Sequence, residues 1–142
     1  MNRIDTTPYG IFLARIALGT MFVSHGLLKV LVFTIPGTVG FFESLGYPGW
    51  LAYATIAGEI GGGALLILGI RTRLVALVLL PVLLGAAQAH WANGWSFSVK
   101  GGGWEYPAFL AIAAAAQVLM GAGAFALDNA LPFGRRTAPA TP

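Results

Sequence analysis

The chain contains no cysteine and few charged residues, and both absences restrict what it can be. Without cysteine it cannot form disulfides, thiolate-bound iron–sulfur clusters or zinc–thiolate sites of its own. Charged residues make up 9% of the sequence, whereas about 25% is usual for a soluble domain. The basic residues are scattered and form no run of the kind that binds nucleic acid. With 57% hydrophobic residues, the composition predicts an integral membrane protein.

Long apolar stretches separated by short polar ones predict a single membrane domain over residues 1–142. Four stretches are long enough to cross a bilayer as helices, at about residues 11–32, 50–70, 74–92 and 104–127. They predict an all-α fold, a four-transmembrane-helix antiparallel bundle. Residues 33–49 contain too many prolines and glycines for a span, so we expect a short amphipathic segment there. We also expect the first stretch to be a retained signal anchor, and the tail from Asp128 to be a frayed end.

The charges and tryptophans of the connecting segments predict the orientation of this bundle. Four spans place both termini and the connection near residue 72 on one side, which carries Arg3, Arg71, Arg73, Arg135 and Arg136. A loop on the other side carries Lys100. Because positive residues favour the cytoplasmic side, we expect both termini to be cytoplasmic. The tryptophans agree, since an aromatic belt at the outer boundary would be formed by Trp50, Trp91, Trp95 and Trp104.

One face of the first predicted helix carries three ionisable side chains, Arg15, His25 and Lys29. Such groups are costly to bury in a membrane and usually face partners or a water-filled cavity. At about 1.5 Å of rise per residue, Lys29 lies roughly 5 Å and His25 roughly 10 Å below the outer end of the helix. Arg15 lies in the inner half, where Gln117 is the polar residue nearest in depth. We expect Arg15 and Gln117 to be structural.

Further polar residues are predicted in the outer half of the bundle, with Glu59 roughly 14 Å below the outer end of its span. We expect a single outward-opening, ligand-binding pocket formed by His25, Lys29, Glu59, Gln88, His90 and Glu105. The alternative is a set of structural pairs, such as Lys29 with Glu105 and His25 with Glu59. Because a polar hydrogen bond between spans contributes only about 0.6 kcal/mol on average, function is favoured for the buried Glu59. For Lys29 and His90, which lie near the interface, contact with water is an equally good explanation.

The remaining motifs argue against several familiar chemistries. Gly58 and Gly62 lie in an apolar helix with no following Lys-Ser or Lys-Thr, so they predict close helix packing rather than a phosphate loop. The two histidines differ in depth, which disfavours a haem between them. A metal site of His25, Glu59 and His90 stays open on depth alone, but no metal is assigned. No Ser-His-Asp arrangement or His-Glu-x-x-His motif identifies catalytic residues.

In their order and spacing, these motifs resemble the DoxX family of small four-helix membrane proteins. The first helix resembles the family's opening pattern through Arg15, Leu18, Gly19, Phe22, His25, Gly26 and Lys29. The second resembles the family's glycine-rich span around Glu59, and further matching positions are Leu68, Gly69, Thr72, Arg73, His90, Gly102 to Tyr106, Leu127 and Asp128. The resemblance covers about residues 11–131. It implies a multi-pass protein of the bacterial cytoplasmic (inner) membrane, associated with quinone-linked redox complexes.

The resemblance and the polar pocket together favour a redox-associated subunit that binds quinone or a similar amphipathic ligand. Glu59 and His25 would bond the quinone oxygens, while Lys29 and Glu105 shape the entrance, as in the membrane subunit of a quinone-linked oxidoreductase. Since the chain lacks cysteine, any electron carrier is bound or comes from a soluble or membrane redox partner. The alternatives are a non-enzymatic anchor or assembly partner for another protein and, less favoured, a small-solute transporter. Homo-oligomerisation stays open.

Overall fold

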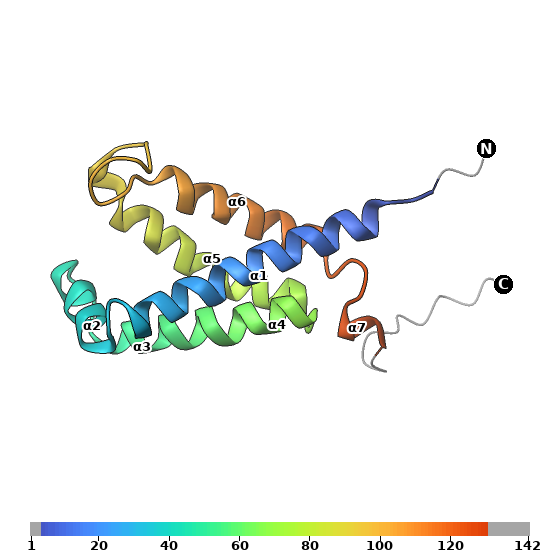
Figure 1. Cartoon of the computed structure of the whole chain (residues 1–142), viewed down its shortest axis with the longest axis horizontal. Helices are drawn as coiled ribbons and strands as arrows, with labels where there is room; N and C mark the ends of the chain where they lie inside the picture. The colour runs from blue at the N-terminus through green and yellow to red at the C-terminus, as the bar shows by residue number, and fades with distance from the viewer. Residues whose placement is uncertain (1–3, 131–142) are drawn as a thin grey trace.

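The computed structural model describes residues 4–130, and within this part of the chain every regular element is a helix (Figure 1). The predicted all-α fold is therefore confirmed for these residues. The helices α3, η1 and α4 follow one another without a break and form one continuous helix from Trp50 to Leu68. In chain order the elements are α1 (Thr7–Leu31), α2 (Ile35–Ser44), α3 (Trp50–Ala57), the π-helix η1 (Gly58–Gly62), α4 (Gly63–Leu68), α5 (Thr72–Ala89), the 3₁₀ turn η2 (Trp91–Asn93), α6 (Glu105–Met120) and α7 (Leu127–Ala130).

Three of these helices are long and apolar enough to cross a membrane: α1, the continuous helix Trp50–Leu68, and α5. The helix α6 is also apolar, but its 16 residues extend over about 24 Å, less than a hydrocarbon core of about 30 Å. The sequence predicts that this span reaches residue 127. The helix instead ends at Met120, because Gly121 and Gly123 adopt positive φ angles of 86° and 69°.

The end of the described chain folds back onto the turn between α4 and α5. The predicted frayed end from Asp128 is wrong at its first residues, since α7 is helical and the Asp128 carboxylate accepts a hydrogen bond from the backbone N–H of Arg71 at 2.6 Å. Residues 131–142 lie outside the described part of the chain. So do Arg3, Arg135 and Arg136, on which part of the orientation argument rests.

The expected short segment between the first two spans is the helix α2. Its N-cap residue Thr34 accepts a hydrogen bond from the N–H of Gly37 at 3.3 Å. One turn later the Thr38 hydroxyl donates to the carbonyl of Lys29 at 3.0 Å, which ties α2 to the end of α1. This bond places α2 beside the C-terminal end of α1, the half of the helix that contains His25 and Lys29 (Figure 1).

Glycines allow α1 to lie directly against the continuous second helix. A Cβ atom added at Gly19 would lie 2.8 Å from the carbonyl oxygen of Gly63, and one added at Gly63 would lie 2.8 Å from that of Gly19. Contacts this short leave no room for any side chain at either position. Two glycines were predicted to mediate packing. A Cβ at Gly62 would lie 2.8 Å from the Leu79 side chain, so this glycine is needed for close packing, whereas a Cβ at Gly58 would make an ordinary van der Waals contact with Leu79 at 3.8 Å.

Arg15 is fully buried and bonds backbone carbonyls instead of an acid. Its Nη1 donates to the carbonyls of Leu66 at 2.7 Å and Ile67 at 2.8 Å, and its Nη2 donates to Ala124 at 3.1 Å. The residue therefore joins α1 to the end of α4 and to the segment after α6. Gln117 forms a separate contact, in which its amide donates to the carbonyl of Gly121 at 2.6 Å.

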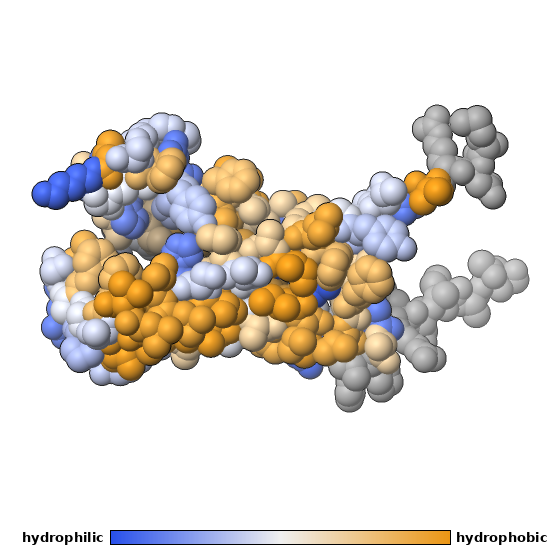
Figure 2. All heavy atoms as spheres, viewed as in Figure 1, coloured by the Kyte–Doolittle hydropathy of each residue, from blue (hydrophilic) through white to orange (hydrophobic). Residues whose placement is uncertain are grey.

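The surface of the bundle is apolar over most of its length. Figure 2 shows hydrophobic residues covering the middle of this face, with hydrophilic residues at the end that carries the α5–α6 loop. Such a surface suits contact with lipid chains rather than with water. The exposed hydrophobic side chains from the long helices include Leu13, Leu31, Leu77, Val78, Leu84, Phe109, Ile112 and Leu119.

Candidate functional site: a polar cavity at one end of the bundle

A cavity of about 1180 Å³ lies where the α5–α6 pair diverges from α1, α2 and α3 (Figure 1). Figure 2 shows the surface hollowed between these two lobes. Most of its wall is apolar, with a small group of polar side chains. The cavity is lined by His25, Lys29, Glu59, Gln88 and His90, which are five of the six predicted ligand-binding residues, and by aromatic residues that include Phe22, Phe41, Phe42, Tyr47, Phe97 and Tyr106.

Lys29 and Glu59 form an ion pair in the wall of this cavity. The Lys29 ammonium group contacts both carboxylate oxygens, at 2.9 and 2.8 Å, and the two side chains are 19% and 7% exposed. The structural alternative considered from sequence was therefore wrong in its partners, because it joined Lys29 to Glu105. Gly26 explains the correct pairing. A Cβ at Gly26 would lie 3.2 Å from the Cβ of Glu59, so its absence lets η1 approach α1.

Glu59 lies in the π-helical segment η1, which the sequence did not predict. A π-turn places one more residue in the turn than an α-helix does, so it changes the direction in which the following side chains point. Such turns are uncommon and occur frequently at functional sites. The available signal was the group of glycines around Glu59, since glycine tolerates departures from regular helical backbone.

The two histidines of the cavity lining each contact a backbone carbonyl through the same ring nitrogen, Nδ1. Nδ1 of His25 lies 2.8 Å from the carbonyl oxygen of Met21, and Nδ1 of His90 lies 3.2 Å from that of Gly102. A carbonyl oxygen can only accept, so Nδ1 is the donor in both rings. In the neutral tautomer Nε2 is then left as an acceptor. The His25 ring also stacks against Tyr106, with centroids 5.9 Å apart.

Gln88 and Glu105 have different positions relative to the cavity. The Gln88 side-chain oxygen accepts a hydrogen bond from the hydroxyl of Tyr47 at 3.0 Å, which bridges α5 and the segment before α3 across the cavity wall. Glu105 begins α6 and accepts from the backbone N–H of Phe97 at 2.8 Å, so it holds the α5–α6 loop and does not line the cavity. Tyr47, Phe97 and Tyr106 were missed by sequence reasoning, because aromatic residues near a membrane boundary are common without any ligand.

Among the described residues, no three His, Asp or Glu side chains come together as metal ligands. The metal site left open for His25, Glu59 and His90 is therefore not formed. The carboxylate of Glu59 is instead held by the Lys29 ammonium group. The arrangement instead offers an ion pair, two imidazole acceptors and an amide around an apolar space.

The chain is similar to known bacterial membrane proteins. It shares 39% identity over 77 residues with a Bacillus subtilis protein named "Putative oxidoreductase CatD", covering 54% of this chain and 56% of that protein's length. It is 35% identical over 133 residues to an uncharacterized protein of Haemophilus influenzae (91% of this chain, 96% of that one). It is 29% identical over 132 residues to the inner membrane protein YqjF of Escherichia coli (86% and 92%).

No solved structure matches the chain. The model of the DoxX family matches residues 10–97, the part that contains α1, the whole second helix with Glu59, α5 and His90. The relatives and the apolar helices agree in making this a bacterial membrane protein with lipid contact. By that match the chain belongs to the DoxX family.

Proposed function

We propose that the protein is a redox-associated membrane subunit that binds quinone, or a similar amphipathic ring compound, in the cavity between its helices. The observation that carries the proposal is that five of the six predicted ligand-binding residues surround one largely apolar space. A volume of about 1180 Å³ slightly exceeds the usual ligand pocket of about 300–1,000 Å³, which leaves room for a ring and the start of an apolar tail. The oxidoreductase name of the Bacillus relative supports the redox assignment.

The polar groups suit the two oxygens of a quinone in both of its redox states. A quinone oxygen only accepts hydrogen bonds, and Lys29 retains one N–H beyond the two that bond Glu59. A quinol hydroxyl donates, and Nε2 of His25 is an acceptor in the same cavity. Tyr106 stacks on His25 and supplies an aromatic wall for the ring. Interconversion moves two electrons and two protons; the histidines and Glu59 serve the protons, and a partner protein supplies or removes the electrons.

The same proposal places α6 across the membrane as a fourth span, with both chain termini on the cytoplasmic side. The helix α6 is shorter than the hydrocarbon core, and the loop before it completes the crossing. In this loop Trp104 stacks on Trp91, with ring centroids 4.7 Å apart, and forms an interfacial anchor. The cavity then opens toward the outer leaflet. Because the chain has no cysteine, single cysteines report orientation cleanly. Ser96→Cys should react with a membrane-impermeant maleimide in intact cells and Thr6→Cys only after lysis; the reverse result would overturn this orientation.

Ligand binding is tested with the purified full-length protein in lipid nanodiscs, titrated with decyl-ubiquinone and followed by tryptophan fluorescence. Glu59→Gln should weaken binding about tenfold, because it removes the charge that orients Lys29. Glu105→Gln is the matched control, since this acid lies at the same end of the bundle but outside the cavity wall. Absence of saturable binding by the wild type, or equal affinities for the two variants, would contradict the proposal.

A further inference from the structure

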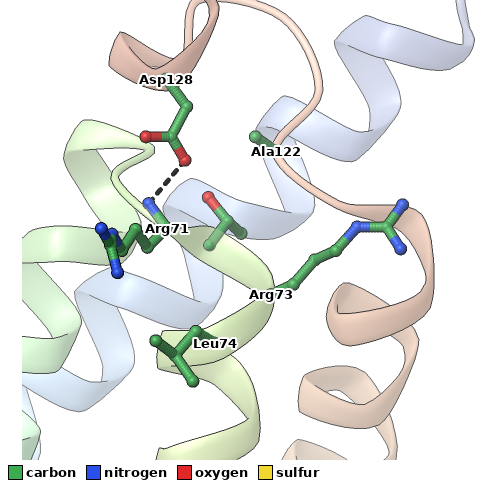
Figure 3. A pocket seen from close by; sticks show the side chains of 6 residues that line it. Arg71, Arg73, Leu74, Ala122 and Asp128 are labelled. Atoms are coloured by element: carbon green, nitrogen blue, oxygen red, sulfur yellow. Dashed lines mark hydrogen bonds between the residues drawn. The ribbon is translucent and has the colours of Figure 1, made fainter. Parts of the chain in front are cut away.

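A second and smaller pocket lies at the opposite end of α5. It has a volume of about 340 Å³ and surrounds the start of the helix (Figure 3). The 18 residues of α5 extend over about 27 Å, so this pocket is well separated from the quinone cavity. Its lining consists of Arg71, Thr72, Arg73, Leu74, Ala122 and Asp128.

The start of α5 presents unused hydrogen-bond donors to this pocket. Within residues 4–130, the backbone N–H groups of Thr72, Arg73 and Leu74 have no hydrogen-bond partner, as expected for the first turn of a helix. Unpaired N–H groups and the helix dipole together attract anions. The helix end is not the only signal, because Thr72 lines the same pocket and its hydroxyl is buried without a hydrogen-bond partner, in a residue that is 2% exposed.

Two arginines add positive charge on either side of the helix start. Figure 3 shows the side chains of Arg71 and Arg73 extending in opposite directions from the start of α5. Both are exposed, and neither forms an ion pair within the described residues. Arg71 has the left-handed φ of 44°, and its backbone N–H is held by Asp128 at 2.6 Å, which fixes the shape of the turn. One carboxylate against two guanidinium groups leaves the pocket with a net positive charge.

We propose that this pocket binds a phosphate group, carried either by an anionic phospholipid or by a free phosphate. A guanidinium group can donate two parallel hydrogen bonds to the oxygens of one phosphate. The helix N-terminus and a buried hydroxyl supply the remaining donors. The pocket adjoins the ends of two membrane-length helices, α4 with its preceding segments and α5, which is the depth of lipid headgroups. Asp128 repels the ligand and limits its affinity.

The test uses the delipidated full-length protein in detergent. Phosphatidylglycerol and inorganic phosphate are titrated separately, with bound species counted by native mass spectrometry. Thr72→Val keeps the shape of the side chain and should weaken binding about fivefold, and Arg73→Gln about tenfold. Asp128→Asn keeps an acceptor for Arg71 and should strengthen binding severalfold. Lys100→Gln, an exposed cation at the far end of the bundle, is the control and should leave the affinity unchanged.

The two titrations identify the source of the phosphate group. Binding of phosphatidylglycerol alone assigns the site to a lipid headgroup, and binding of both probes assigns it to any accessible phosphate. The proposal is overturned if neither probe binds. It is equally overturned if Thr72→Val and Arg73→Gln bind as tightly as Lys100→Gln does, because lipid contact would then be independent of this pocket.

Discussion

Replacing Arg15 should reveal how much of the bundle depends on one buried guanidinium group. The residue is 0% exposed and donates three hydrogen bonds to carbonyls at the end of α4 and after α6. In Arg15→Met the apolar volume is largely kept. The carbonyl of Leu66 retains its bond from the N–H of Gly69, whereas those of Ile67 and Ala124 lose their donor.

The free energy of unfolding should fall by about 2–4 kcal/mol in Arg15→Met. Each of these partly buried carbonyls left without a partner costs at most about 1–3 kcal/mol, and removing a buried charge returns part of that loss. Arg15→Lys should be at least as destabilised, because a lysine keeps the charge but cannot span carbonyls from two segments with a planar fork. This order, with lysine no better than methionine, is specific to a carbonyl-bonding role.

The measurement is reversible unfolding in mixed micelles, followed by circular dichroism. Lys100→Met is the control, because an exposed loop residue should change the free energy of unfolding by no more than about 0.5 kcal/mol. A free energy of unfolding for Arg15→Met within that same range of the wild type would refute the structural role of these three hydrogen bonds. Full stability in Arg15→Lys would refute this role as well, since a simple point charge would then suffice.

The glycine contact and the ion pair give two further predictions. Gly19→Ala and Gly63→Ala should each destabilise the bundle by about 2–3 kcal/mol in the same unfolding assay, because each added methyl group lies 2.8 Å from a backbone oxygen. Gly61→Ala is the control and should be neutral or mildly stabilising, because no atom lies within 4 Å of the added methyl group. Equal effects at all three positions would contradict this close packing of the helices. In a double-mutant cycle, Lys29→Met and Glu59→Gln should each lower the free energy of unfolding by about 2–4 kcal/mol, and the double variant should lower it by less than the sum of the two. Strict additivity would show that the two side chains are not energetically coupled.

The helical architecture followed from hydrophobicity, because runs of 18 or more apolar residues leave few alternatives to a long helix. The ends of these helices were harder to predict from the sequence. The fourth stretch stays apolar beyond Met120, so composition gives no stop, and only the positive φ angles at Gly121 and Gly123 end the helix. A glycine in a membrane helix is too common to be a stop signal in itself.

The positions of the polar residues were predicted better than their partners. Depth along straight helices brought His25, Lys29, Glu59, Gln88 and His90 to one end of the bundle, and all five line one cavity. The predicted depths of Lys29 and Glu59 differ, although their side chains are in contact. A long lysine side chain and the π-turn at Glu59 change the level at which the two charges lie, and depth along a straight helix includes neither effect.

Contacts to the backbone were beyond the sequence altogether. Depth in the membrane pointed from Arg15 to a polar side chain, Gln117, whereas the guanidinium group bonds carbonyls that any residue could supply. The same is true of Glu105, whose acceptor role toward the N–H of Phe97 depends on how the loop folds. Recognising the Gly19–Gly63 contact required knowing that α1 packs on α4, which neither glycine indicates alone.

The most direct test of the proposed quinone cavity is cross-linking with a photoreactive quinone, mapped by mass spectrometry on the full-length protein in nanodiscs. The account predicts labels on aromatic residues of the cavity wall, such as Phe41, Tyr47 and Tyr106, that disappear when excess decyl-ubiquinone is present. Labels confined to the exposed outer face of α6, at Phe109 and Ile112, and unaffected by the competitor would contradict it.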